Sequence, residues 1–273
     1  MSIYHQTDLV TLYQGDCLEV MPQLEARSFD CILADLPYGL VNCKWDSVIP
    51  FEPLWEQYKR LIKPNGAIVL FGSQPFTTDL IMSNRTWFKY CWIWEKPKTT
   101  GHLDANRKPL KAHEDIVVFC DGSTKYIPQI SAKPIENIRP ASRRGASRGG
   151  GSSCYGSFDS KADRLIGVDW AYPKSVLKFS NQTGLHPTQK PIALLEYLIR
   201  TYTNEGDTIL DNTAGSGTAL VAARNTNRRA VGIEMDESYC RVAAGRLGRF
   251  EPSEFEVDKK AVDGQLGLFG AIA

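Results

Sequence analysis

Hydrophobic and polar residues follow two repeating patterns along this chain. Apolar runs of four or five residues, typical of buried strands, occupy 10–13, 31–34, 67–71, 90–94, 115–119, 208–211 and 230–234. Helical spacing occurs over 51–62, 76–82, 190–202, 218–225 and 237–247, and a short helix over 17–24 is interrupted by Pro22. Because the two kinds of element alternate, the pattern predicts an α/β sheet with helices on both faces.

One long stretch lacks either pattern. From Asp121 to about Ser180 the chain is rich in Gly, Ser, Pro and Arg, a composition that cannot bury a core of its own. It is either a flexible loop or a recognition insert that becomes ordered on binding. We therefore expect two halves of one domain with an insert between them and a tail after them, over 1–120, 121–180, 181–249 and 250–273.

The composition is that of an ordinary globular protein, with 273 residues of which 42% are hydrophobic and 23% charged. No apolar stretch approaches the length of a membrane span, and the first residues lack the features of a secretory signal, so we expect a cytoplasmic protein. Seven cysteines and four histidines show no spacing typical of metal ligands, and nothing in the sequence indicates a metal site or a disulfide framework.

The net charge of +1 hides a basic segment. Residues 85–148 contain thirteen Lys or Arg and six Asp or Glu, which gives this segment a net charge of +7. Such a segment is either a solvated surface or a surface that meets phosphates.

A glycine-rich turn indicates a ligand site. In "ILDNTAGSGTALVAA" a predicted strand ends at Asp211 and a predicted helix begins near Thr218, which brings backbone N–H groups close to a ligand. A phosphate loop would need a lysine after its last glycine, and a dinucleotide site would need glycine at Leu220. Glu234 ends the next strand, where an acidic side chain accepts hydrogen bonds from ribose hydroxyls. The pattern favours a nucleoside cofactor over a tight turn without a ligand.

Four motifs together resemble a known enzyme family. They are "DLPYG" (35–39), "HPTQKP" (186–191), "DNTAGSGT" (211–218) and "GIE" (232–234), and their order is similar to that of the circularly permuted, or beta-class, amino-directed DNA methyltransferases. The resemblance implies a Rossmann-like methyltransferase sheet, mostly parallel, with 121–180 as a largely irregular target-recognition insert. It also implies S-adenosylmethionine as cofactor and direct, in-line methyl transfer to the exocyclic N6 of a flipped-out adenine in double-stranded DNA.

The residues of the first motif suit that reaction. The lone pair of an exocyclic amine is delocalised into the ring, so an enzyme must hold acceptors against its hydrogens. Asp35 and the carbonyl of Leu36 are the expected acceptors, Pro37 restricts the backbone of the residue before it, and Tyr38 offers a ring on which the base can stack. The family often has proline where this chain has Leu36, but only the backbone carbonyl is used there, so we expect activity to be retained.

The resemblance extends to the remaining site residues. Asp16 and Cys17 would recognise the cofactor's adenine, and Thr188, Lys190 and Thr218 would lie near its methionine end. The other expected cofactor-binding residues are Asp35, Asp211, Thr213, Gly215, Ser216, Gly217 and Glu234. In the insert, four arginines would contact phosphates or guanine edges: Arg139, Arg143, Arg144 and Arg148.

Partners and alternatives remain open at this stage. The tail residues Gln265, Leu266, Leu268 and Phe269 resemble a peptide that binds the bacterial sliding clamp, or they pack on their own domain. Family members often form homodimers, and the resemblance suggests a bacterial or phage-like protein of the nucleoid with a role in restriction and modification.

The alternative functions are cytosine-N4 methylation and a catalytically silent DNA-binding protein on the same fold. An Asp at position 35 favours adenine over cytosine. A protein-glutamine methyltransferase is disfavoured because its motif begins with Asn and follows the glycine-rich motif, and a dehydrogenase is disfavoured by the glycine spacing.

Overall fold

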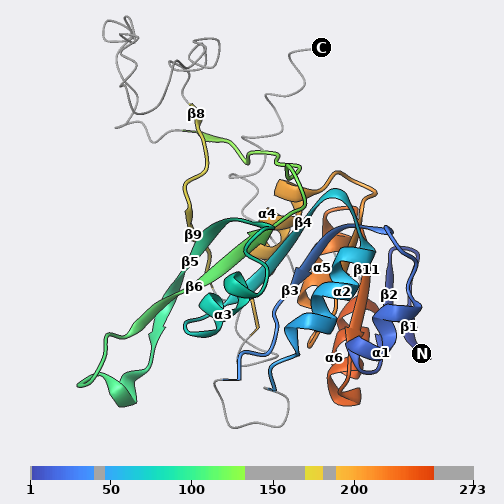
Figure 1. Ribbon diagram of the computed structural model, residues 1–273, viewed down its shortest axis with the longest axis horizontal. Helices are drawn as coiled ribbons and strands as arrows, with labels where there is room; N and C mark the ends of the chain where they lie inside the picture. The colour runs from blue at the N-terminus through green and yellow to red at the C-terminus, as the bar shows by residue number, and fades with distance from the viewer. Residues whose placement is uncertain (1, 40–46, 133–169, 181–188, 249–273) are drawn as a thin grey trace, which may run out of the picture. The chain divides into compact units, whose positions relative to one another are not determined.

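The computed structural model describes residues 2–39, 47–132, 170–180 and 189–248 (Figure 1). The chain divides into a larger unit, Met1–Ile127 with Lys174–Phe255, and a smaller unit, Pro128–Pro173 with Glu256–Ala273. In the smaller unit, β7 (Ser131–Ala132) pairs antiparallel with β8 (Trp170–Ala171). The expected DNA-binding arginines Arg139, Arg143, Arg144 and Arg148, and the tail residues Gln265, Leu266, Leu268 and Phe269, lie outside the described residues.

Within the described residues, a nine-stranded sheet organises the larger unit, in the order β1-β2-β11-β10-β3-β4-β6-β5-β9. Among its described strands, five neighbouring pairs are parallel and three are antiparallel. The strands are β1 (Ser2–Gln6), β2 (Val10–Gln14), β3 (Phe29–Ala34), β4 (Ile62–Gly72), β5 (Phe88–Thr100), β6 (Lys111–Phe119), β9 (Val176–Lys178), β10 (Thr208–Asp211) and β11 (Arg229–Glu234). The helices are α1 (Cys17–Val20), α2 (Phe51–Leu61), α3 (Phe76–Ser83), α4 (Ile192–Tyr202), α5 (Thr218–Asn225) and α6 (Glu237–Gly248), with 3₁₀ turns η1 (Met21–Gln23) and η2 (His102–Asp104).

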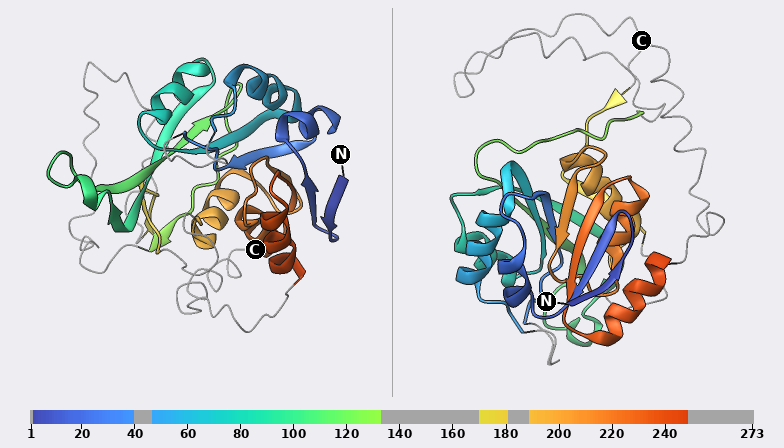
Figure 2. Two further views of the ribbon diagram at one scale, coloured as in Figure 1. Left: turned by 90° about the horizontal axis from the view of Figure 1, so that it is seen from below. Right: turned by 90° about the vertical axis from the view of Figure 1, so that its right-hand side faces the viewer.

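Strand side chains alternate between two cores, one on each face of the sheet. In β3, Cys31 and Leu33 belong to one core, and Ile32 and Ala34 belong to the other. The first core includes apolar residues of α4, α5 and α6, and the second includes those of α1, α2 and α3. Figure 2 shows the helices on both faces of the sheet. The predicted α/β fold with a mostly parallel sheet is confirmed.

All the predicted strands and helices are present, but the sequence did not predict two further strands that are mostly polar or exposed. The strand β1, whose residues are mostly exposed, and β9, in which one residue of three is buried, lack the apolar runs that reveal a strand. The sequence predicts that the chain leaves α2 at "KPNG" and starts a strand at Ala67, whereas β4 already begins at Ile62. The pairing of β3 with β4 shifts between Phe29–Ile62 and Cys31–Ala67, so the polar residues form a bulge inside one strand.

The helix α4 holds the residues that precede it in position at one end of the site. Its residues Leu194, Leu195, Leu198 and Ile199 are buried and recur every three or four positions, which fixes its apolar face against the sheet. Pro191 precedes its first turn, where the missing N–H costs no helical hydrogen bond. No helix among the described residues has both the length and the apolar character needed to cross a membrane.

Candidate active site

The expected site residues gather at one edge of the sheet. The strands β2, β11, β10 and β3 lie side by side and parallel, so their carboxyl ends share this edge. Asp16 and Cys17 follow β2, Asp35–Tyr38 follow β3, the glycine-rich turn follows β10, and Glu234 ends β11. From β3 and β10 the chain proceeds to strands on opposite sides, so the two form a topological switch point, where α/β sheets bind ligands.

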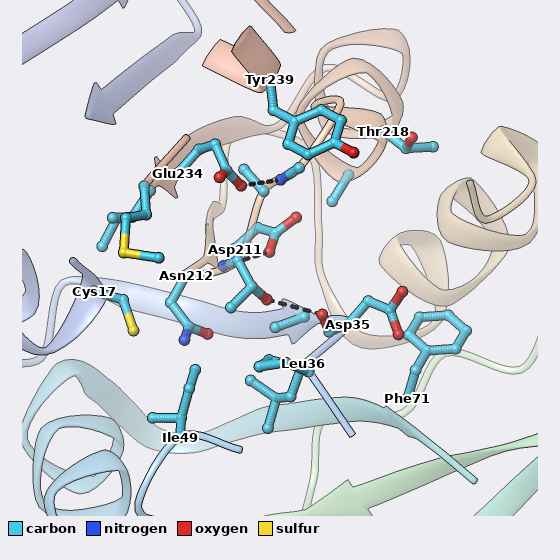
Figure 3. Close-up of a pocket in the computed structure, with 18 of the residues that line it drawn as sticks. Cys17, Asp35, Leu36, Ile49, Phe71, Asp211, Asn212, Thr218, Glu234 and Tyr239 are labelled. Atoms are coloured by element: carbon cyan, nitrogen blue, oxygen red, sulfur yellow. Dashed lines mark hydrogen bonds between the residues drawn. The ribbon is translucent and has the colours of Figure 1, made fainter. Parts of the chain in front are cut away.

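A cavity of about 820 Å³ opens at this edge (Figure 3). That volume is in the range of sites for nucleoside-sized ligands, roughly 300–1,000 Å³. The expected residues that line it are Asp16, Cys17, Asp35, Leu36, Pro37, Tyr38, Lys190, Asp211, Thr213, Gly215, Ser216, Thr218 and Glu234. Thr188 lies outside the described residues.

Gly217 does not line the cavity, although the motif suggested a cofactor role for it. It stands at the start of α5 with a φ of 77°, a conformation that favours glycine. A Cβ at this position would lie 2.8 Å from the Cβ of Ala243 on α6. Gly217 therefore lets α5 begin close against α6, and it shapes the turn rather than the wall of the cavity.

The Asp35 carboxylate is held by two donors. The Nζ of Lys190 lies 2.6 Å from its Oδ2, and the hydroxyl of Tyr38 donates to its Oδ1 at 2.6 Å. Lys190 is only 8% exposed and also pairs with Glu114 at 3.1 Å, and Glu114 pairs in turn with Lys96. Burial disfavours the charge of Lys190, but the two carboxylates outweigh burial and raise its pKa. The result is a chain of alternating charges that ends at Asp35.

Packing in the core and a hydrogen bond from the glycine-rich turn hold the motif that follows β3 in place. The side chain of Leu36 is 3% exposed and packs in the core beneath α1 and α2, which explains how this position accepts leucine in place of proline. The ring of Tyr38 lies 5.1 Å from that of Phe76 on α3. Thr213 of the glycine-rich turn donates from its hydroxyl to the backbone carbonyl of Asp35 at 3.1 Å. A hydrogen bond therefore connects the segment that follows β3 directly to the glycine-rich turn.

Two acidic residues, Glu234 and Asp211, line the cavity from neighbouring strands (Figure 3). Glu234 accepts the backbone N–H groups of Gly215 and Asp236 at 2.7 and 2.8 Å, so it closes the turn, and each oxygen keeps a further lone pair. Asp211 is buried and accepts the N–H of Thr213 at 3.1 Å. Burial, with the nearby charges of Asp35 and Glu234, raises the pKa of Asp211 to about 8. A cationic ligand would stabilise the ionised form of Asp211 and so lower its pKa.

Asn212 has a role that the sequence did not reveal. Its side chain is part of a residue only 2% exposed, and its Oδ1 accepts the hydroxyl of buried Tyr58 at 2.6 Å. Its Nδ2 has no nitrogen or oxygen acceptor among the described residues, and the neighbouring sulfur of Cys17 is a weak one. Asn212 lies inside the motif 211–218, but Tyr58 is 154 positions away on α2, where the sequence pattern indicates only a helix.

Arg246 on α6 also stabilises the site. Its NH1 donates to the carbonyl of Ser216 at 2.6 Å and to the hydroxyl of Thr218 at 3.1 Å. These contacts hold the glycine-rich turn against α6. No pattern in the sequence links an arginine on the last helix to a turn thirty residues earlier.

The cavity residues fit a nucleoside cofactor such as S-adenosylmethionine. Glu234 supplies acceptors suited to ribose hydroxyls, the Nδ2 of Asn212 supplies a buried donor that lacks a strong partner, and Asp211 supplies an acid suited to a cation. Within the described residues, no three His, Cys, Asp or Glu side chains form a cluster that could hold a metal ion.

Comparison with known proteins identifies related sequences. The model of the DNA methylase family matches residues 29–245. The chain is 26% identical over 264 residues to the type II methyltransferase M.HpaI of Haemophilus parainfluenzae, a match that covers 85% of this chain and 72% of that one. It is 23% identical over 259 residues to the type II methyltransferase M1.MboII of Moraxella bovis, covering 88% and 97% of the two chains.

Solved structures show the same fold. The PvuII DNA methyltransferase, described as cytosine-N4-specific, superimposes with a TM-score of 0.65 and 16% identity, over 96% of this chain and 93% of that one. The complex of M1.HpyAVI with SAM superimposes with a TM-score of 0.58 and 20% identity, over 88% of this chain and all of that one.

Proposed function

The chain belongs to the DNA methylase family, and on that basis we propose that it methylates the exocyclic N6 of a flipped-out adenine in double-stranded DNA, with S-adenosylmethionine as donor. The observation that carries this proposal is the Asp35 carboxylate, held between Lys190 and Tyr38 at the mouth of the cofactor-sized cavity. An aspartate at this position of the motif favours adenine.

The residues of the motif would activate the amine. S-adenosylmethionine, when bound, supplies an electrophilic methyl group on a sulfonium. Asp35 and the Leu36 carbonyl would accept the two N–H groups of the amine, which localises its lone pair on nitrogen. Methyl transfer would form the new N–C bond as the S–C bond breaks, with the electron pair of that bond left on sulfur, and the cationic amine would then lose one proton to solvent water. The negative charge of Asp35 stabilises the positive charge that develops on the amine.

The reaction product tests this proposal. Purified protein, labelled S-adenosylmethionine and mixed-sequence duplex DNA are incubated, and the DNA is hydrolysed for nucleoside mass spectrometry. We expect N6-methyladenine. A second candidate, supported by the similarity to the cytosine-N4-specific PvuII enzyme, predicts N4-methylcytosine instead. Label found only in protein, or in no macromolecule, would contradict both.

Asn212 provides a test of the cofactor's position. Replacement by leucine removes the donor and keeps a similar volume, so we expect S-adenosylmethionine affinity to fall by about tenfold, the equivalent of one neutral hydrogen bond. Tyr58→Phe keeps the amide but frees it to rotate, and we expect a smaller loss. Calorimetric titration measures both. Equal affinity of the Asn212→Leu variant and the wild type would exclude contact with the cofactor.

Asp211 predicts a dependence of cofactor affinity on pH. Its pKa of about 8 means that the carboxyl is mostly protonated at pH 6 and ionises as the pH rises toward 8. Because the sulfonium favours the ionised form, affinity for S-adenosylmethionine should rise with pH between 6 and 7.5, by at most about tenfold per pH unit. Asp211→Asn should bind more weakly and with a flatter profile. A wild-type profile as flat as that of the variant would refute the assignment.

A further inference from the structure

The strands β5 and β6 extend beyond the rest of the sheet as a hairpin. The pairing of β4 with β6 ends at Gly72–Asp115, and that of β9 with β5 ends at Glu95–Lys178. Beyond these points, β5 and β6 pair only with each other among the described strands, up to Thr100–Lys111. We call residues 95–111 the arm. Figures 1 and 2 both show it standing away from the helices and strands of the larger unit.

The arm is basic and has no core. It carries five Lys or Arg and two Asp or Glu, a net charge of +3. Lys96 pairs with Glu114 and Lys108 with Asp104, whereas Lys98 and Arg107 are exposed and have no ion-pair partner in the described part of the chain. Such free positive charges suit phosphate groups.

Leu103 lies at the end of the arm and is fully exposed. It is part of η2, which follows Gly101 in the left-handed conformation, so the backbone turns and presents the leucine outward. A fully exposed apolar side chain in a segment of net positive charge is typical of the side chains that enter a DNA groove and insert between base steps.

The arm begins at the wall of the cavity. Lys111 and Glu114 line the cavity, and Lys96 pairs with Glu114 from the opposite strand. At about 3.3 Å per residue, the five steps from Glu95 to Thr100 span at most roughly 17 Å, which is enough to cross a DNA groove of about 6 or 12 Å width. We propose that the arm binds double-stranded DNA beside the extruded base, with Lys98 and Arg107 on phosphates and Leu103 in the groove. This inference rests on the proposed action on DNA.

Binding of a fluorescent mixed-sequence duplex at several salt concentrations tests the role of the arm. For Lys98→Ala/Arg107→Ala we expect weaker binding, with a slope of log K against log salt that is smaller by about 2, since each phosphate contact contributes about 0.9. For Leu103→Ala we expect severalfold weaker binding with an unchanged slope. The matched control is Arg229→Ala, an exposed arginine at the amino end of β11, opposite the cavity edge.

The measurements on the arm variants decide whether the arm binds DNA. Variants of the arm that match Arg229→Ala in both affinity and slope would overturn it, even if the wild type methylates DNA. Cofactor titration and the unfolding temperature are measured on every variant, and we expect both to equal those of the wild type because the arm contributes no core. A wild type that neither binds nor methylates DNA would instead refute the proposed function.

Discussion

Replacing Asp35 with alanine is expected to lower kcat for DNA methylation by about 10³-fold, the loss typical when a site is deprived of a principal electrostatic contact. The amine would keep only the Leu36 carbonyl as acceptor, so its lone pair would stay delocalised. The fold should survive because Lys190 keeps Glu114 as a partner at 3.1 Å. Single-turnover methylation, with cofactor and DNA both saturating, measures the chemical step.

Two further variants test whether the lower kcat results from the loss of an acceptor for the amine. Asp35→Asn keeps the shape of the side chain but places a donor among the acceptors, and we expect a loss nearly as large. Asp30→Ala removes an aspartate from the other end of β3, where it pairs with Lys63 at 2.7 Å, and should change stability without changing the chemical step. Full activity of Asp35→Ala would show that the carboxylate does not act on the amine.

Residues in contiguous motifs were predictable because their roles are local. A carboxylate at the end of a buried strand and a turn of small residues before a helix require only neighbouring positions. The positions of Asp35, Asp211 and Glu234 at strand ends were predicted in this way, and all three line the cavity. The expected strands and helices were likewise those with an apolar face that packs in one of the two cores.

Residues that act through distant partners were not predictable. Tyr58 orients Asn212 across 154 positions, and Arg246 reaches Ser216 from α6. Glu114 directly precedes the predicted strand 115–119, and only the folded sheet brings it to Lys190. The arm was missed for another reason: its strands are exposed and polar beyond the sheet, so they have no hydrophobic period. The sequence did show their charge, as part of the basic segment 85–148.

The second large expected effect is on stability, and it follows from the pairing of Lys190 with two carboxylates. Lys190→Met removes a buried charge that lies between Asp35 and Glu114, and we expect the free energy of unfolding to fall by about 3 kcal/mol. The loss is at the low end for a buried pair because Glu114 keeps Lys96 and Asp35 is one-third exposed. Denaturant unfolding measures it, and Lys63→Met, in a partly exposed pair with Asp30, should cost at most about 1 kcal/mol.

The pH dependence and the activity of Lys190→Met separate electrostatics from packing. The lysines lower the pKa of Glu114 against the opposing effect of burial, so the stability from this pair is present above pH 4.5 and is lost as the pH falls through the folded-state pKa. Lys190 has a raised pKa, so its contribution is lost only as the pH rises above about 10.5. The difference from the wild type should thus stay constant near neutral pH and shrink in acid. A difference that does not shrink at all as the pH falls below 4.5 would indicate lost packing instead. Because Asp35 loses the donor on Oδ2, we also expect kcat to fall by about 10²-fold, and Lys190→Arg should restore stability more fully than kcat.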